Sequence, residues 1–161
     1  MARYSRDMPK PAAKPLPSLY DQDFHAWSQE QGLLLKARNP AALDWDNLAE
    51  EIESLGRSDR REIESRLAVI LEHLLKWEVQ PESRSGSWRA TLLEQRSRIA
   101  RLLVESPSLR SFPASAAPGE YEIARQRAAA ETGLPLTAFP AAIPYSIAEV
   151  LDPDHLPGRK E

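Results

Sequence analysis

The side chains best suited to chemistry in this sequence lie between positions 73 and 89. His73, Arg84, Trp88 and Arg89 combine an imidazole, two guanidinium groups and an indole within one short stretch. An imidazole can transfer protons, and arginine together with tryptophan can contact phosphates and bases. These four residues are therefore the candidate functional patch. The competing interpretation is structural, because a histidine at the edge of an apolar helix face is more often a hydrogen-bonded packing residue.

A second candidate is an acidic helix face formed by Asp46, Glu50 and Glu53. Their spacing of i, i+4 and i+7 places three carboxylates on one side of a helix, opposite Leu48 and Leu55. Such a row could hold a divalent cation if another helix supplied further ligands. A solvated helix face, or the partner of a basic helix, is the more common use of this pattern. The sequence thus predicts no metal site and no cofactor.

A catalytic role would require His73 to meet a carboxylate, such as Glu50 or Glu53, in a cleft. The usual catalytic motifs are missing, because none of the three histidines belongs to a Glu-x-x-His or His-Glu-x-x-His sequence and no Gly-x-Ser-x-Gly occurs. The chain also has no cysteine. The enzyme therefore remains an alternative to an interaction or regulatory module without catalysis.

Nucleic-acid binding is a third hypothesis, and it depends on the segment from Arg84 to Arg101. Five arginines in this segment stand against Glu94 as its one acidic residue, and Trp88 could stack on a base. The arginines bracket an apolar helix face, however, where such side chains usually lay their methylene groups along the core edge. Because the whole chain carries a net charge of −3, nucleic acid is not an expected partner. An unidentified protein or a second copy of the chain is the expected one.

The composition indicates a soluble globular protein of one domain. Its 161 residues are 42% hydrophobic and 28% charged, and no apolar run approaches a membrane span. Residues 1–17 are basic and proline-rich and lack the apolar centre of a secretory signal, so we expect a disordered tail. The absence of cysteine favours the cytoplasm.

The 14 prolines divide the rest of the chain. Proline is excluded from helix interiors, and the proline-free stretches 18–39, 41–80, 82–106 and 119–134 all carry helical periodicity. They predict an all-α, single-domain bundle over residues 18–157, with about four main helices. Residues 135–145 are expected to form coil packed over the core, followed by a short C-terminal helix.

The second stretch leaves one question open. Trp45, Leu48, Ile52 and Leu55 form an apolar stripe, and a second stripe begins at Ile63 after seven residues without an apolar side chain. A kink or break near glycine 56 is slightly favoured over a continuous helix. All four tryptophans fall on apolar helix faces and are expected to pack in the core. The helix of the fourth stretch is expected from about residue 120.

The order of motifs resembles a known family. Consecutive segments read YDQDFHAWSQEQGLLL from position 20, LDWDNLAEEIESLGRSDRREIESRL from 43 and HLLKWEVQPESRSGSWR from 73. They are similar to the bacterial domain-of-unknown-function family 29, found in cyanobacteria and proteobacteria. The resemblance covers about residues 20–157 and implies a small, all-helical cytoplasmic protein. It brings no catalytic residues, and the prolines at 113 and 118 interrupt what resembles a continuous helix in the family.

Overall fold

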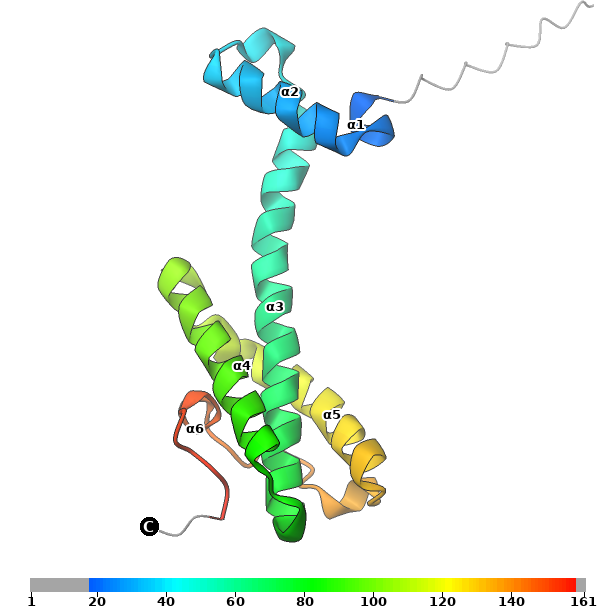
Figure 1. Cartoon of the computed structure of the whole chain (residues 1–161), viewed down its shortest axis with the longest axis vertical. Helices are drawn as coiled ribbons and strands as arrows, with labels where there is room; N and C mark the ends of the chain where they lie inside the picture. The colour runs from blue at the N-terminus through cyan, green and yellow to red at the C-terminus, as the bar shows by residue number, and fades with distance from the viewer. Residues whose placement is uncertain (1–17, 159–161) are drawn as a thin grey trace, which may run out of the picture. The chain divides into compact units, whose positions relative to one another are not determined.

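The computed structural model describes residues 18–158 and confirms the all-α prediction (Figure 1). The described part of the chain contains no strand. Its six α-helices are α1 (Leu19–Gln22), α2 (Phe24–Lys36), α3 (Trp45–Val79), α4 (Gly86–Glu105), α5 (Phe112–Thr132) and α6 (Ile147–Leu151). Four 3-10 helices connect them, namely η1 (Pro40–Ala42), η2 (Pro81–Ser83), η3 (Pro107–Leu109) and η4 (Leu136–Ala138). The tail predicted for residues 1–17 lies outside the described residues.

The chain divides into two compact units, and α3 contributes residues to both. Unit 1 ends at Ile52 and unit 2 begins at Glu53. The domain boundaries predicted from the sequence, 18–157, stay a prediction.

Unit 1 contains α1, α2 and the first turns of α3. The sequence indicated one helical run from residue 18, but the structure separates α1 from α2 at Asp23. The Asp23 carboxylate accepts a hydrogen bond from the backbone N–H of Ala26 at 2.9 Å, and this cap starts a new helix. Only Trp27 and Gln31 are buried among the described residues of this unit.

The helix α3 is continuous through Gly56, so the expected break is wrong. Trp45 and Ile63 are five whole helical turns apart, and one unbroken helix keeps both apolar stripes on the same side. The polar residues between the stripes remain solvated; Arg57, for example, pairs with Glu53 at 3.4 Å. Asp44 caps the helix as expected, since its carboxylate accepts from the Asn47 N–H.

The core of unit 2 is built around the second half of α3. This part of α3 contributes six leucine and isoleucine side chains to the core, and α4 and α5 pack against it (Figure 1). The coil that follows α5 adds Phe139 and Tyr145 to the same core, as the sequence predicted. Ser146 caps the last short helix, α6, and its predicted capping box with Glu149 is present.

The helix α5 begins eight residues earlier than the expected start at Glu120. Pro113 lies in the first turn of α5, where a backbone N–H would have no hydrogen-bond acceptor within the helix, so proline removes no helical hydrogen bond there. Pro118 lies in the interior and removes one backbone hydrogen bond, yet the helix continues because its buried face packs on the core. Gly133 ends the helix with φ of 70°, as predicted.

Candidate functional site

Two of the four patch residues, His73 and Trp88, meet in an ionic cluster centred on Lys76. The Lys76 ammonium donates to the carboxylates of Glu72, at 3.2 Å, and Glu131. It also lies 5.2 Å from the centroid of the Trp88 ring, a cation–π distance. The His73 ring meets the same indole edge-on, with centroids 6.5 Å apart. The cluster therefore ties α3 to both α4 and α5.

Burial determines the electrostatics of this ionic cluster. Lys76 and Glu72 are only 5% and 6% exposed. Partial burial lowers the pKa of His73, and its Nδ1–H donates to the backbone carbonyl of Val69 at 2.9 Å. The hydrogen bond from Lys76 lowers the pKa of Glu131. At neutral pH the lowered pKa keeps the His73 imidazole neutral.

This arrangement differs from the cleft that the catalytic alternative required. The carboxylates near His73 are Glu72 and Glu131, and both already accept hydrogen bonds from Lys76. Glu53, one of the expected partners, pairs instead with Arg57 on the solvated side of α3. The cluster connects helices, and its acidic groups are occupied.

The other two patch residues, Arg84 and Arg89, lie beside the C-terminal segment. Arg84 donates from Nε to the Trp77 carbonyl at 2.8 Å, and its guanidinium lies 5.3 Å from the centroid of the Trp77 ring. The Arg89 side chain is exposed and makes no hydrogen bond, ion pair or ring contact with any residue that the structure describes. The patch is therefore split into two separate environments.

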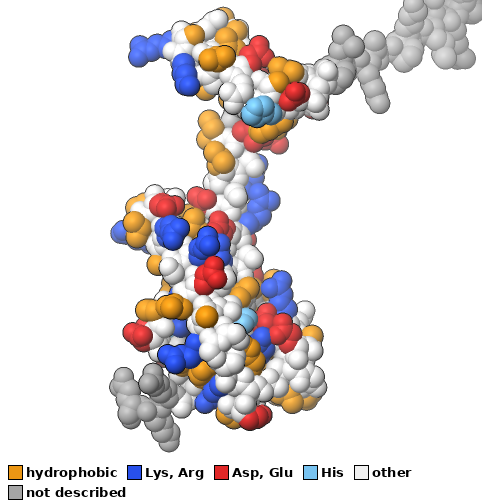
Figure 2. Space-filling model, in the orientation of Figure 1, with side chains coloured by type: hydrophobic (Ala, Val, Ile, Leu, Met, Phe, Trp, Pro, Cys, Tyr) orange, Lys and Arg blue, Asp and Glu red, His pale blue; other side chains and the backbone are white. Residues whose placement is uncertain are grey.

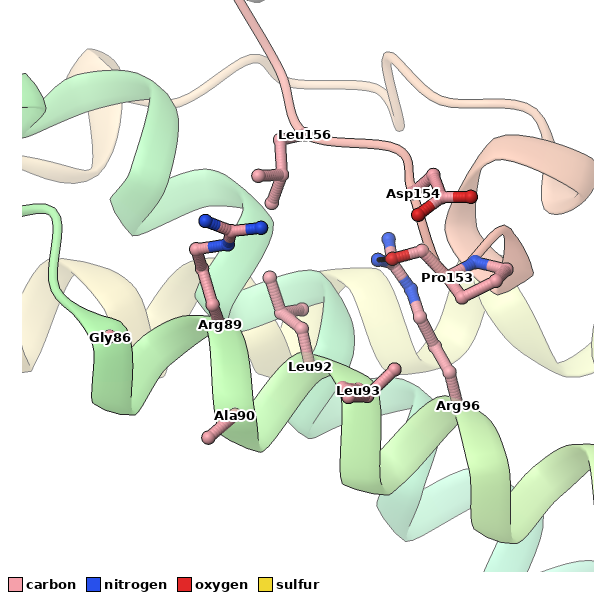
Figure 3. A pocket seen from close by; sticks show the side chains of 9 residues that line it. All are labelled: Gly86, Arg89, Ala90, Leu92, Leu93, Arg96, Pro153, Asp154 and Leu156. Carbon is pink, nitrogen blue, oxygen red and sulfur yellow. Dashed lines mark hydrogen bonds between the residues drawn. The ribbon is translucent and has the colours of Figure 1, made fainter.

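A cavity of about 380 Å³ lies between α4 and the C-terminal segment (Figure 3). Its lining includes Arg89, Leu92, Leu93, Arg96, Asp154 and Leu156. Figure 3 shows both arginines projecting from α4 towards the C-terminal segment, with Leu92 between them. A second cavity of about 220 Å³ adjoins it, is lined by Arg84, and shares Arg89 and Leu156.

Arg96 is an internal anchor for the C-terminal segment. It is 3% exposed, and its Nε donates to the Val150 carbonyl at 2.9 Å. Its Nη atoms donate to the backbone carbonyls of Glu149, Pro153 and His155. Burial lowers the pKa of Arg96, and this effect is opposed by nearby carboxylates of the C-terminal segment. Arg96 therefore cannot contact nucleic acid as the row of five arginines suggested.

The other arginines of the segment from Arg84 to Arg101 do not form a common basic surface either. Arg98 pairs with Glu94 at 3.4 Å, while Arg84 stacks on Trp77. Arg89 and Arg101 are left exposed at opposite ends of the helix.

The acidic face of α3 lies in solvent. Asp46, Glu50 and Glu53 are all exposed, and only Glu53 has an ion-pair partner, Arg57. Among the residues described, no group of three or more histidine and acidic side chains is placed to hold a metal ion.

The structure leaves much of the apolar stripe at the start of α3 uncovered. Trp45 and Ile52 are 60% and 68% exposed, so the expectation that all four tryptophans are core residues is wrong. Trp27 and Trp77 are buried, Trp88 is half-buried, and Trp45 donates its indole N–H to the Pro40 carbonyl. Hydrophobic side chains gather on the surface of unit 1 (Figure 2).

A shallow apolar hollow of about 260 Å³ lies beside Trp45 in unit 1. Its lining residues are Leu34, Leu35, Arg38, Asn39, Pro40, Leu43 and Trp45. Arg38 follows the end of α2 with φ of 53°, in the left-handed region that side chains other than glycine rarely adopt. We call this feature the unit 1 hollow.

Sequence reasoning missed Lys76 and Arg38. The i, i+4 spacing of Glu72 and Lys76 is a readable signal for an ion pair, but nothing in the sequence placed Glu131 against them. Nothing in the sequence signals the left-handed conformation of Arg38, because glycine or asparagine is the residue expected in that conformation.

Fold and sites together define a small helical protein in which buried charges tie the helices together and unit 1 carries an uncovered apolar hollow. The chain belongs to the family described as domain of unknown function DUF29, whose model matches residues 19–156. This match confirms the resemblance noted in the sequence. No curated protein and no solved structure matches the chain. Within the part of the chain that is described, no helix is long and apolar enough to cross a bilayer.

Proposed function

We propose that the protein is a cytoplasmic interaction module without catalysis of its own. In this proposal the unit 1 hollow binds an apolar segment of a protein partner, and acidic residues flank that segment. The observation that supports it is the exposure of large apolar side chains around the hollow.

The hydrophobic effect favours covering this surface. Leu35 and Trp45, which line the hollow, are 50% and 60% exposed, and only Trp27 and Gln31 of the described residues of unit 1 are buried. Each Å² of apolar surface removed from water contributes roughly 25 cal/mol. Contiguous exposed apolar side chains mark protein contact sites, and tryptophan is enriched among the residues that dominate binding energy.

The charge at the hollow specifies the flanking residues of the partner. Lys36 is the last residue of α2, and Arg38 follows it by two positions. Neither side chain has a hydrogen-bond or ion-pair partner among the described residues. Holding an arginine in the left-handed conformation costs roughly 1 kcal/mol. Strain of this kind is concentrated at functional positions. Arg38 lines the hollow, and an unpaired cation beside an apolar surface favours a segment in which an aromatic or aliphatic anchor adjoins aspartate or glutamate.

The test is selection of random peptides displayed against the full chain. We expect enrichment of peptides in which leucine, phenylalanine or tryptophan adjoins acidic residues. Arg38→Glu should weaken their binding by about tenfold, because it converts an attractive charge into a repulsive one. The control Arg101→Glu reverses an exposed charge on α4 and should leave the affinity unchanged.

Three results would contradict the proposal. The first is a selection in which no peptide is enriched. The second is that the enriched peptides bind the Arg38→Glu variant as tightly as the parent. The third is that sedimentation shows a concentration-dependent dimer, which the Leu35→Ser substitution abolishes. The last result would assign the hollow to a second copy of the chain.

A further inference from the structure

We infer that the cavity between α4 and the C-terminal segment binds a small organic anion, a carboxylate or a phosphate ester, with a short apolar group. The inference uses no residue of the unit 1 hollow and stands independently of the proposed function. It depends on three properties of the cavity: its uncompensated charge, the burial of one of its cations and the apolar character of its walls.

The two adjoining cavities contain more positive than negative charge. Arg84, Arg89 and Arg96 line them, and Asp154 is the one acidic residue of the lining. None of the three guanidinium groups forms an ion pair with a carboxylate within the described part of the chain. Arg84 and Arg96 donate to backbone carbonyls, which satisfy N–H groups but carry no net charge. An anion is the missing partner.

The burial of Arg96 makes this missing charge costly. The guanidinium is 3% exposed, and moving a cation out of water is unfavourable unless charge and hydrogen bonds compensate it. Asp152 and Asp154 act on it only at longer range, because neither forms an ion pair with it. An anion elsewhere in the same cavity would add to this long-range compensation without contacting Arg96.

The positions of the charges orient the ligand. Asp154 lies at the Arg96 end of the cavity, where its carboxylate repels a second anion (Figure 3). The other end opens to the space shared by Arg89 and Arg84. The anionic group of the ligand therefore belongs between Arg89 and Arg84, where two guanidinium groups can donate to its oxygens.

The walls specify the rest of the ligand. Leu92, Leu93 and Leu156 line the larger cavity, and Leu93 is 57% exposed in the free protein. A volume of about 380 Å³ is at the lower end of the range for small-molecule sites. A ligand with one anionic group and a short alkyl or aryl chain covers these leucines and leaves Asp154 free.

Calorimetric titration of the full chain tests the inference with four probes. Hexanoate and hexyl phosphate present the anionic group and the alkyl chain together, hexanol lacks the charge, and inorganic phosphate lacks the chain. We expect at least one of the first two to bind at least about tenfold more tightly than either single-feature probe. Comparison of hexanoate with hexyl phosphate then shows whether the site prefers a carboxylate or a phosphate.

Arg89→Gln supplies the specific variant, and Arg101→Gln is its matched control on the same helix. Both arginines are exposed and unpaired among the residues described, so both variants should keep the parent melting temperature. Binding should weaken by about tenfold or more in Arg89→Gln and stay unchanged in Arg101→Gln. The inference is overturned if no probe binds, if hexanol or inorganic phosphate binds as tightly as the combined probes, or if Arg89→Gln binds like the parent.

Discussion

Replacement of Lys76 by methionine should be among the most damaging single changes in unit 2. The ammonium is buried between Glu72 and Glu131 and lies over the Trp88 ring. Methionine has a similar length and can occupy the same space, but it carries no charge and donates no hydrogen bond. The substitution thus removes the partner of a buried carboxylate with little change in packing volume.

The expected loss can be divided between the two carboxylates. Glu131 has a side chain that is 57% exposed, so water can hydrate it once Lys76 is gone. Glu72 has a side chain that is 7% exposed and would remain as a buried, unpaired anion. Breaking a buried pair from one side costs about 3–5 kcal/mol. We therefore expect the free energy of unfolding to fall by about 3 kcal/mol, mostly because of Glu72.

The decisive comparison is with the double variant Glu72→Met/Lys76→Met. Replacing both charges removes the desolvation penalty, so the double variant should recover most of the lost stability and lie within about 1 kcal/mol of the parent. Urea unfolding followed by circular dichroism measures the free energy of unfolding of the parent and of each variant. Glu131→Gln should cost less than about 1 kcal/mol as the exposed control. The reasoning is refuted if Lys76→Met unfolds like the parent, or if the double variant is no more stable than the single one.

Three further predictions concern a histidine, an arginine and two glycines. Burial holds the pKa of His73 below 6.5, so at a pH below 6.5 the unfolded chain binds more protons than the folded chain. The free energy of unfolding should therefore fall as the pH drops below 6.5, and His73→Gln should flatten that part of the pH profile. Arg96→Met should lower the free energy of unfolding by about 2–4 kcal/mol and increase proteolysis of the C-terminal segment, because the backbone carbonyls of that segment lose their hydrogen-bond donor. The control Arg101→Met should have neither effect. Gly56→Ala should raise the free energy of unfolding by about 0.5–1 kcal/mol, because an added Cβ meets no other atom in a continuous helix, and destabilisation by this change would contradict a continuous α3. Gly133→Ala should lower the free energy of unfolding, because φ at this position is 70°.

Local signals in the sequence predicted the secondary structure well. The helix ends at Gly133 and Ser146 follow from the conformational freedom of glycine and from a side chain that caps the next turn. These interactions span only a few residues, so the sequence contains all the information they require. Packing of an apolar face outweighs a local helix breaker at the start of α5, whereas Gly56 lies in a solvent-exposed part of α3, where a single glycine weakens a helix by only about 1 kcal/mol and does not end it.

The candidate site could be predicted only in part. The sequence singled out His73, Trp88 and Arg89 because their side chains are unusual for packing, and the structure places all three at polar or open positions. It could not show that Lys76, rather than a catalytic carboxylate, is the group that His73 and Trp88 surround.

The sequence by itself determined which segments are helical, where most of them end and which side chains could carry charge or bind. Only the tertiary structure decided which of these groups meet. Arg89 and Arg96 are one heptad apart on the same helix, yet one is exposed and the other is buried under the C-terminal segment. Helical periodicity fixes the direction of a side chain on its own helix, but burial depends on which distant segment covers it. Arg96 and Val150, whose carbonyl accepts its Nε–H, lie 54 positions apart, and no local pattern encodes that contact.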